Sequence, residues 1–189
     1  MGDPVIETER LILRQWREAD ADAMHAMGQD ARVMAYLGPL YDRAAAERLV
    51  AGRIVNQSLF GYCFWPIERR ADGMFLGFCG LQLGPKGTPI EGGIEIGWRL
   101  AHHAWGYGYA REAAEATLAW GWDTFDMGHI AAMTVPMNTR SGHLMEWLGM
   151  RRVVNEDFDH PDLAEDDPLR RHIYKVIKMR YVDCLLFRL

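Results

Sequence analysis

The pattern of apolar and polar positions predicts a mixed α/β fold. Short apolar runs bounded by turn residues are typical of strands. They lie at residues 11–16, 61–68, 74–83, 94–100, 130–135, 151–158 and 172–179. Apolar residues at helical spacing predict helices that begin near Asp20 or Asp22, after Asp42, near Tyr109 and at Asn138. The predicted order is one strand, two helices, three strands, a helix, a strand, a helix and two strands.

Turn signals refine this order. The D-G pair at Asp72 and Gly73 separates two strand runs and predicts an antiparallel hairpin. Gly77 and Gly80 in the next run indicate a bend or a close backbone neighbour. An early G-x-G-x-x-G and regular strand–helix alternation are both missing, which argues against a Rossmann-type fold. We expect a single domain over 1–189, in which the tail 180–189 is unassigned.

Composition and charge limit the class of protein. The 189 residues are 49% hydrophobic and 25% charged, which suffices for a sizeable core. The net charge of −5 argues against a general nucleic-acid binder, with a local basic patch as the alternative left open. Three cysteines without C-x-x-C spacing fit a reducing compartment. The N-terminus is polar and no apolar run approaches the roughly 20 residues of a membrane helix, so we expect a cytoplasmic protein without membrane contact.

The segment from Ile94 to Glu112 is the strongest candidate for a binding site. A strand run, a turn with Gly106 and Gly108, and a helix start follow one another directly. The first amides of a helix lack intrahelical partners and favour anions, and glycines let the backbone approach a phosphate closely. The segment therefore predicts a site for a phosphate-bearing ligand. A plain glycine turn without a ligand is the alternative.

Metal chemistry and a cysteine nucleophile are not expected. His102 and His103 are adjacent instead of at ligand spacing, and no cysteine or carboxylate cluster joins them. Cys79 lies in a strand run and is interpreted as a packing residue.

Five motifs follow one another along residues 6–178. They are E-T-E-R-L-I-L-R (7–14), G-F-C-G-L (77–81), I-E-I-G-W-R-L with W-G-Y-G-Y-A-R-E-A (94–100 and 105–113), N-T-R-S-G-H-L-M-E-W-L-G-M (138–150), and D-F-D-H-P with P-L-R-R-H (157–161 and 168–172). In this register the chain resembles the GNAT superfamily of acyl-CoA-dependent N-acyltransferases, most closely its ribosomal-protein N-terminal acetyltransferase-like (Rim-type) branch. The resemblance implies a mostly antiparallel, twisted central sheet of about seven strands flanked by about four helices.

The resemblance also implies an activity. The protein would transfer an acetyl group from acetyl-CoA to a primary amine, either a protein N-terminus or a small-molecule amine. The amine would attack directly in a ternary complex, without a covalent intermediate. A homodimer is common in this branch. The alternatives are a non-catalytic acyl-CoA-binding or regulatory protein of the same fold, and a generic nucleotide-binding α/β domain.

The resemblance places acetyl-CoA at the glycine turn and the strand before it. The pyrophosphate-binding residues would be Gly106 and Gly108 with the amides of Tyr107, Tyr109 and Ala110. His103 stands where the family often has Gln or Arg and would act through its backbone. The backbone of Trp98, Arg99 and Leu100 would bind the pantetheine arm and polarise the thioester carbonyl. Asn138 would also bond this arm, although it is equally an ordinary helix cap.

Three residues are candidates for moving protons. Glu95 lies on a central strand, where a carboxylate is costly to bury unless it is used or paired. It would bind the substrate ammonium or accept its proton, and a buried ion pair is the alternative. The resemblance places Ser141 near the sulfur as an acid for the departing thiolate, although serine is also common at helix starts. His160 would be a base near neutral pH, against the alternative of a loop hydrogen bond.

The determinants of the acceptor are the least readable part of the sequence. Trp65 and the segment 33–40 are candidates for lining the acceptor pocket. The loop 156–167 is rich in acidic residues, which favours a cationic acceptor. A solvated loop explains the same charge.

Overall fold

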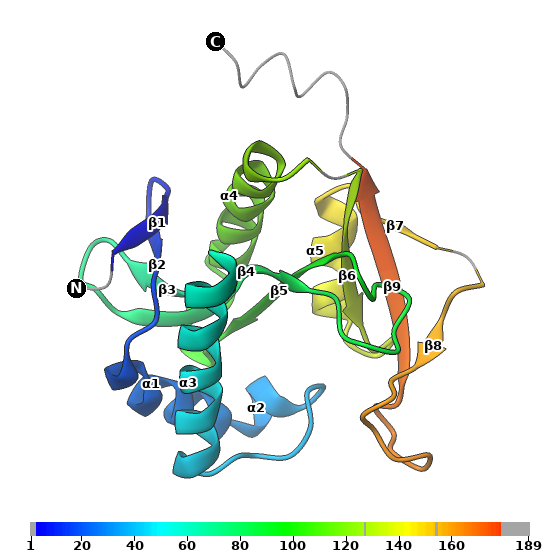
Figure 1. Cartoon of the computed structure of the whole chain (residues 1–189). Coiled ribbons are helices and arrows are strands. Elements are labelled where there is room, and N and C mark those ends of the chain that lie inside the picture. Colours follow the sequence, from blue (N-terminus) through cyan, green and yellow to red (C-terminus); the bar gives the residue numbers. More distant parts are fainter. Residues whose placement is uncertain (1–2, 127, 154, 179–189) are drawn as a thin grey trace. The chain divides into compact units, whose positions relative to one another are not determined.

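The computed structural model describes residues 3–126, 128–153 and 155–178, which divide into two compact units. The first unit contains residues 3–82 and 96–117, and the second contains 83–95 and the described residues from 118 onward. Figure 1 labels their helices and strands. The expectation of a single domain stays a prediction. The unassigned tail 180–189 lies outside the described residues.

The sheet of the first unit is built from antiparallel neighbours. β1 (Pro4–Glu7) pairs with β2 (Leu11–Arg14), β2 with β3 (Phe64–Arg69), and β3 with β4 (Phe75–Leu83). β5 (Ile94–Leu100) is the neighbour of β4. The predicted strands and the hairpin at Asp72 and Gly73 are confirmed. β1 was not predicted because its side chains, apart from that of Ile6, are exposed or only partly buried.

Gly77 explains how closely β4 approaches β5. A Cβ on Gly77 would come within 2.1 Å of the Arg99 carbonyl oxygen and 2.6 Å of the Leu100 Cα. The register between β3 and β4 shifts at the same point, between Ile67 and Glu68. The predicted close backbone neighbour is therefore confirmed, because a side chain at this position would collide with β5.

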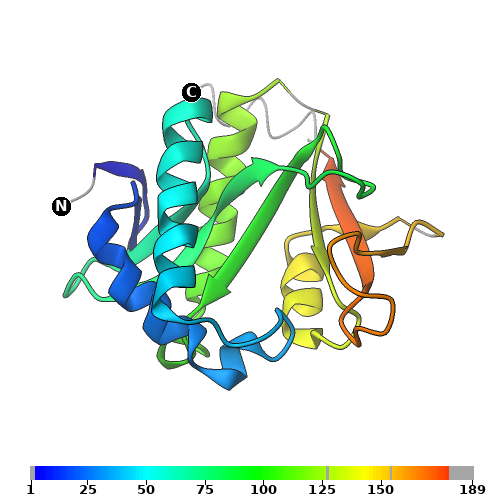
Figure 2. The same ribbon diagram turned by 60° about the horizontal axis from the view of Figure 1, so that its bottom comes forward.

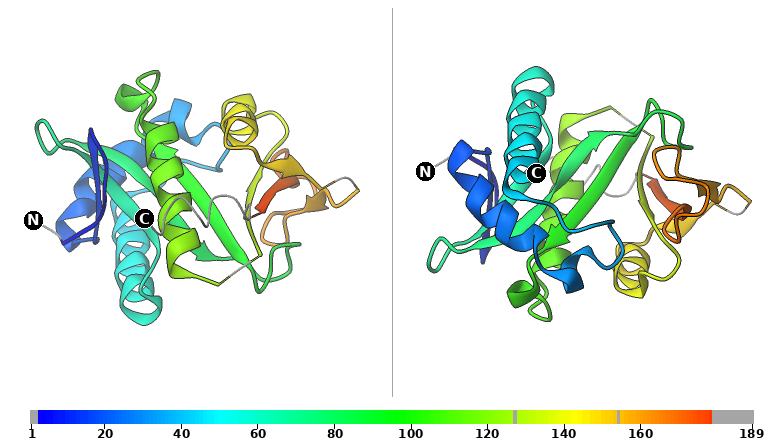
Figure 3. Two further views of the ribbon diagram at one scale, coloured as in Figure 1. Left: turned by 90° about the horizontal axis from the view of Figure 1, so that it is seen from above. Right: turned by 90° about the horizontal axis from the view of Figure 1, so that it is seen from below.

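Three α-helices precede β3 in the described part of the first unit, and the first and third of them lie side by side (Figure 3). α1 (Ala21–Gly28) and α2 (Ala31–Met34) follow the 3-10 helix η1 (Glu18–Asp20), and α3 (Arg43–Phe60) packs on α1. The predicted cap at Asp42 is confirmed, because its carboxylate accepts from the Ala45 amide at 2.8 Å. Of Asp20 and Asp22, the two candidates for the start of the first helix, Asp20 is the N-cap residue of α1. Its carboxylate makes no cap hydrogen bond and accepts from the Arg14 guanidinium instead.

That contact belongs to a buried ion network between β2, β3 and η1. Arg14 is only 1% exposed, and its guanidinium lies 2.7 Å from both the Asp20 and the Glu68 carboxylates. Arg17 adds a second cation, 3.0 Å from Glu68. Burying a charge is tolerated when it is paired and hydrogen-bonded, and here each charge has an opposite partner.

The helix after the glycine turn packs on the other face of β4. Cys79 Sγ lies 3.6 Å from the Thr117 Oγ1 of α4 (Tyr109–Thr124), whereas the neighbouring Phe78 ring faces Arg53 of α3. Successive residues of a strand point to opposite faces, so α3 and the start of α4 cover opposite sides of β4 (Figure 2). The small residues Ala113, Ala114 and Thr117 of α4 are all fully buried.

The second unit is organised around β6 (His129–Thr134). The start of β5 pairs with it in parallel through Glu95 and Ala131, and β9 (Arg171–Lys178) pairs with it antiparallel along its whole length. α5 (Thr139–Trp147) follows β6, as predicted. With sheet strands and helices in both units, the mixed α/β fold is confirmed.

The predicted strand 151–158 is wrong. Two short strands, β7 (Arg151–Arg152) and β8 (Phe158–Asp159), pair with different parts of β9. Between them Asn155 has a φ of 67°, which a continuous strand cannot contain. The apolar residues of this run therefore predicted one strand, although a turn divides the segment.

Candidate functional site

The glycine turn is the centre of the candidate site in the first unit. Gly106 and Gly108 both have positive φ, 84° and 80°, which residues with a side chain rarely adopt. α4 begins at Tyr109, and the Glu112 amide donates to the Gly108 carbonyl at 3.1 Å to close the first helical turn. The amides of residues 109–111 precede this bond and have no partner within the helix, so they are suited to an anion.

Arg10 braces this turn, a contact that sequence reasoning missed. Its Nη1 donates to the Tyr107 carbonyl at 3.0 Å, and its guanidinium lies 4.8 Å from the centre of the Tyr109 ring. Its Nε and Nη2 lie 2.7 and 2.6 Å from the Glu112 carboxylate, to which the Thr8 hydroxyl also donates at 2.6 Å. The only sequence signal was an acidic residue in the first turn of a helix, which is favourable there in any case.

The link between β5 and the turn is fixed by two side chains. The 3-10 helix η2 (His102–Ala104) forms this link. Trp105 Nε1 donates to the Leu100 carbonyl at 2.9 Å, and the His103 ring lies 3.3 Å from the Phe75 carbonyl through Nε2. The His103 side chain is thus turned toward β4, which fits the expectation that this residue contributes through its backbone.

The remaining predicted ligand-binding residues of the first unit surround this link. Trp98 and Arg99 are partly buried on β5, and Leu100 is buried. Tyr107 is exposed and its ring stacks on that of Tyr109 at a centroid distance of 5.7 Å. The first unit therefore brings together the predicted pyrophosphate and pantetheine residues, apart from Asn138. Their roles stay predictions.

Glu95, Asn138 and Ser141 lie in the second unit. Glu95 is 6% exposed and stands opposite Ala131 in the parallel register. Asn138 is the N-cap of α5: its Oδ1 accepts from the Ser141 amide at 3.3 Å, and its Nδ2 donates to the Ser141 Oγ at 3.2 Å. The helix-cap hydrogen bond expected as the alternative role of Asn138 is therefore present in the structure. Their predicted roles toward acetyl-CoA and the acceptor stay predictions.

His160 takes part in a compact group at the start of β9. Its Nδ1 accepts from the Asp162 amide at 3.3 Å, and its ring lies 5.0 Å from the His172 ring. Phe158 packs on both histidines. Burial, with the neighbouring His160, lowers the pKa of His172 below its ordinary value, although a hydrogen bond to the Arg170 carbonyl opposes this. The loop hydrogen bond considered for His160 is present, and its role as a base stays a prediction.

Cys79 has the properties of a packing residue. Its side chain is fully buried, and burial raises the pKa of its thiol to about 12. A thiol with so high a pKa is protonated near neutral pH and is a poor nucleophile. This agrees with the interpretation of Cys79 as core.

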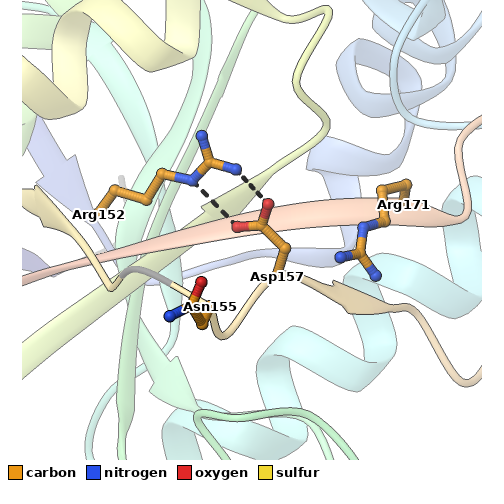
Figure 4. A pocket seen from close by; sticks show the side chains of 4 residues that line it. All are labelled: Arg152, Asn155, Asp157 and Arg171. Carbon is orange, nitrogen blue, oxygen red and sulfur yellow. Dashed lines mark hydrogen bonds and ion pairs between the residues drawn. The ribbon is translucent and has the colours of Figure 1, made fainter.

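The second unit also has a hollow of about 360 Å³ lined by Arg152, Asn155, Asp157 and Arg171. Figure 4 shows the Arg152 guanidinium facing the Asp157 carboxylate across two contacts. Asp159 pairs with Arg171 at 3.2 Å. None of the predicted site residues lines this hollow. These ion pairs balance the charges of the described lining residues, which therefore offer no unpaired charge that would attract a charged ligand.

Within the described residues, no cluster of three or more His, Cys, Asp or Glu residues is arranged to hold a metal ion. Among the described helices, none is both long and apolar enough to cross a membrane.

Comparisons with known proteins agree on one family. The model of the GNAT acetyltransferase domain matches residues 10–151. The YkkB protein of Bacillus subtilis (strain 168) is 33% identical over 144 residues, which cover 76% of this chain and 83% of that protein. The uncharacterized N-acetyltransferase p20 of Bacillus licheniformis is 29% identical over 187 residues, or 96% of this chain and 93% of p20.

Solved structures confirm the fold. A GNAT-family acetyltransferase from Bacillus anthracis superposes with a TM-score of 0.74 at 26% identity, covering 92% of this chain and 97% of that one. RimL, a ribosomal L7/L12 α-N-protein acetyltransferase solved with coenzyme A, gives a TM-score of 0.73 at 14% identity, covering 94% and 98%. The second likeness is one of fold alone. The expected mostly antiparallel sheet flanked by helices is thus confirmed.

Proposed function

Because this chain belongs to the GNAT acetyltransferase family and is an acetyl-CoA-dependent acetyltransferase, we propose that it acetylates a primary amine by direct attack in a ternary complex. The observation that carries this proposal is the glycine turn. Gly106 and Gly108 both have positive φ, and α4 begins directly after them with amides that have no partner within the helix. This arrangement suits the binding of a diphosphate through main-chain groups.

The residues of the turn fit the diphosphate of acetyl-CoA. A Cβ built on Gly106 would meet no atom within 4 Å, and one on Gly108 would meet only the Arg10 Nη2 at 3.6 Å. The outer side of the turn is therefore open, and its glycines add no side chain that would hold a phosphate away. Arg10 stands beside Gly108, and its charge is paired with Glu112, so it supports the site by holding the Tyr107 carbonyl of the turn. The amides of Tyr109 and Ala110 would bind the phosphate oxygens.

Acetyl-CoA supplies the acetyl thioester, and the chain must orient the amine and manage two protons. The new carbon–nitrogen bond forms as the carbon–sulfur bond breaks; the amine loses a proton and the departing thiolate gains one. We assign the first proton to Glu95, directly or through water, and the second to Ser141. The acceptor is either a protein N-terminus or a small-molecule amine.

Replacing Gly108 tests the proposed site. In Gly108→Ala, the side chain at a φ of 80° strains the turn by about 1–2 kcal/mol and displaces the amides. We expect the Kd for coenzyme A, measured by calorimetry, to rise about tenfold, the equivalent of about 1.4 kcal/mol. Thiol release from acetyl-CoA with a panel of amines should fall in parallel at low acetyl-CoA concentration.

Gly73→Ala is the matched control. Gly73 has a φ of 71° in the β3–β4 hairpin and, like Gly106, has open space around it. This variant should lose comparable stability and keep the wild-type affinity for coenzyme A. Equal affinities in wild type and Gly108→Ala would contradict the site. Thermal stabilisation by ATP or NAD in preference to coenzyme A would contradict the cofactor, and coenzyme A binding without any amine-dependent thiol release would support the non-catalytic alternative.

Glu95→Gln tests the proposed base. The substitution keeps the shape of this buried side chain but removes its ability to take a proton. We expect turnover to fall about 100-fold or more, since a positioned general base contributes about 10²–10⁴ in rate. The pH dependence of kcat should lose its acidic limb. Undiminished turnover across pH would rule out the base role.

A further inference from the structure

Arg99 is a partly buried cation to which the described residues offer no carboxylate. It lies on β5 in the first unit, and its Nε is inaccessible to solvent without a hydrogen-bond partner in that part of the chain. The groups around its side chain are an aromatic ring, a thioether and a phenol. The guanidinium carbon lies 5.3 Å from the centre of the Phe78 ring, and Nη1 lies 3.8 Å from the Met34 sulfur. Tyr41 is its third neighbour.

Arg14 of the same unit has different surroundings. It is buried and meets two carboxylates, Asp20 and Glu68. Arg99 has an aromatic face, a thioether and a phenol instead. These groups compensate a guanidinium less well than an anion does, because a buried charge is stabilised chiefly by an opposite charge with hydrogen bonds. Burial accordingly lowers the pKa of Arg99, and Tyr41 offsets only part of this effect.

The surroundings of Arg99 are held in place. Tyr41 donates its hydroxyl to the Met24 carbonyl at 3.1 Å, and its ring lies where a Cβ on Gly28 would stand, within 2.1 Å. The ring is therefore fixed against α1 by a glycine that makes room for it. A cation beside such fixed groups is preorganised to receive a ligand, since little ordering is needed on binding.

The location of Arg99 separates it from the glycine turn. Its partner Phe78 is on the face of β4 that meets α3, whereas Cys79 meets α4 on the other face. The amides proposed to bind the diphosphate lie at the start of α4. Arg99 therefore stands on the α1–α3 side, which includes Met34 from the segment expected to line the acceptor pocket.

We propose that the Arg99 side chain binds a carboxylate of the acceptor, and that the acceptor is a small amine that also carries a carboxylate, as an amino acid does. The inference rests on the proposed amine acetylation and names its substrate class. A guanidinium binds a carboxylate with two parallel hydrogen bonds, which would supply the opposite charge that the described residues do not offer to this cation. This role belongs to the side chain, and the role expected for Arg99 in holding the pantetheine arm belongs to its main chain.

Two carboxylates of the acidic loop are already paired with arginines, which reduces its demand for a cationic acceptor. Asp157 is paired with Arg152, and Asp159 with Arg171 and Arg170. These two carboxylates are neutralised by neighbouring arginines, so the charge of this loop is smaller than its sequence indicates.

The test compares acceptors that differ only in the carboxylate. Wild type, Arg99→Gln and Arg99→Lys are assayed for thiol release from acetyl-CoA with free amino acids and with the corresponding amino acid amides. Wild type should prefer the acids. Arg99→Gln should lower kcat/KM for the acids by about 30-fold or more, as expected when one member of a buried charge pair is removed, and should equalise acids and amides. Arg99→Lys should recover part of the preference, because it keeps the charge without the planar fork.

Arg53→Met is the matched control. Arg53 comes from α3 and lies 4.6 Å from the Phe64 ring and 6.0 Å from the Phe78 ring, so its removal takes a cation from the same aromatic group. It should keep the wild-type preference for acids. Circular dichroism and thermal melting establish that each variant is folded, and a misfolded Arg99→Gln leaves Arg99→Lys to decide by its preference.

The possible results separate this inference from the proposed function. Wild-type turnover of amides or plain amines equal to that of acids would overturn the inference while acetyl transfer stands. A raised KM for acetyl-CoA in Arg99→Gln with unchanged acceptor preference would place the side chain at the cofactor and also overturn it. Coenzyme A binding without thiol release to any acceptor would defeat the proposed function itself.

Discussion

Glu112 connects the start of α4 to the turn between β1 and β2 through one carboxylate. It accepts hydrogen bonds from the Thr8 hydroxyl and from the Arg10 amide and guanidinium. Burial opposes its charge, but these hydrogen bonds outweigh it and hold the pKa of the carboxyl below its ordinary value. Because Arg10 also holds the Tyr107 carbonyl, the same carboxylate indirectly fixes the glycine turn.

Glu112→Gln should therefore weaken both stability and ligand binding. The amide keeps the size of the side chain but loses the charge, and its NH₂ group faces donors in place of an acceptor oxygen. We expect the free energy of unfolding in urea to fall by about 1–2 kcal/mol, in the range for hydrogen bonds to a charged group that is partly open to solvent. The Kd for coenzyme A should rise several-fold, because the turn loses its brace.

Glu115→Gln provides the control on the same helix. Glu115 is exposed and lies 3.7 Å from Arg111 in an i,i+4 pair, a type worth about 0.5 kcal/mol or less. It should leave both measurements close to wild type. Equal losses in the two variants would show that the effect reflects helix charge in general and that the Arg10 brace does not position the turn.

At the scale of elements, prediction succeeded where a segment is determined by its own residues. α3 begins after the predicted Asp42 cap, which is a local signal. β5 has the predicted bounds because its apolar run is interrupted on both sides by loop residues. The glycine turn belongs to the same class, since positive φ at Gly106 and Gly108 is a property of glycine itself.

Prediction failed where a distant residue decides. Asp20 stands at a cap position, yet Arg14 of β2 takes its carboxylate. Arg10 and Glu112 are 102 positions apart, and the sequence around each one indicates only an exposed charged side chain. Arg99 was predicted only for its backbone, because the lack of a carboxylate around its side chain can be recognised only once β4, α2 and Tyr41 have been brought together.

At the scale of the whole molecule, the histidine group of the second unit makes stability depend on pH. The pKa of His172 is lowered from 6.5 by burial and by His160, so the unfolded chain binds a proton more readily than the folded one. Between the lowered pKa and 6.5 the unfolded state therefore carries more protons, and the free energy of unfolding decreases as the pH falls through this window. The stabilisation due to neutral His172 is fully present above that window.

Replacing His172 by phenylalanine should remove this part of the pH dependence. The ring keeps an apolar contact with Phe158 but has no proton to bind, so the loss of stability between pH 7.5 and pH 5.5 should be smaller than in wild type. Urea unfolding at the two pH values measures this difference directly, and any constant cost of losing the Arg170 hydrogen bond cancels in it. His129→Gln, at an exposed position on β6, should show the wild-type difference. A His172→Phe protein that loses as much stability as wild type on acidification would assign the effect to other groups. His172 can account for it only if its partly buried ring binds a proton less readily in the folded than in the unfolded protein.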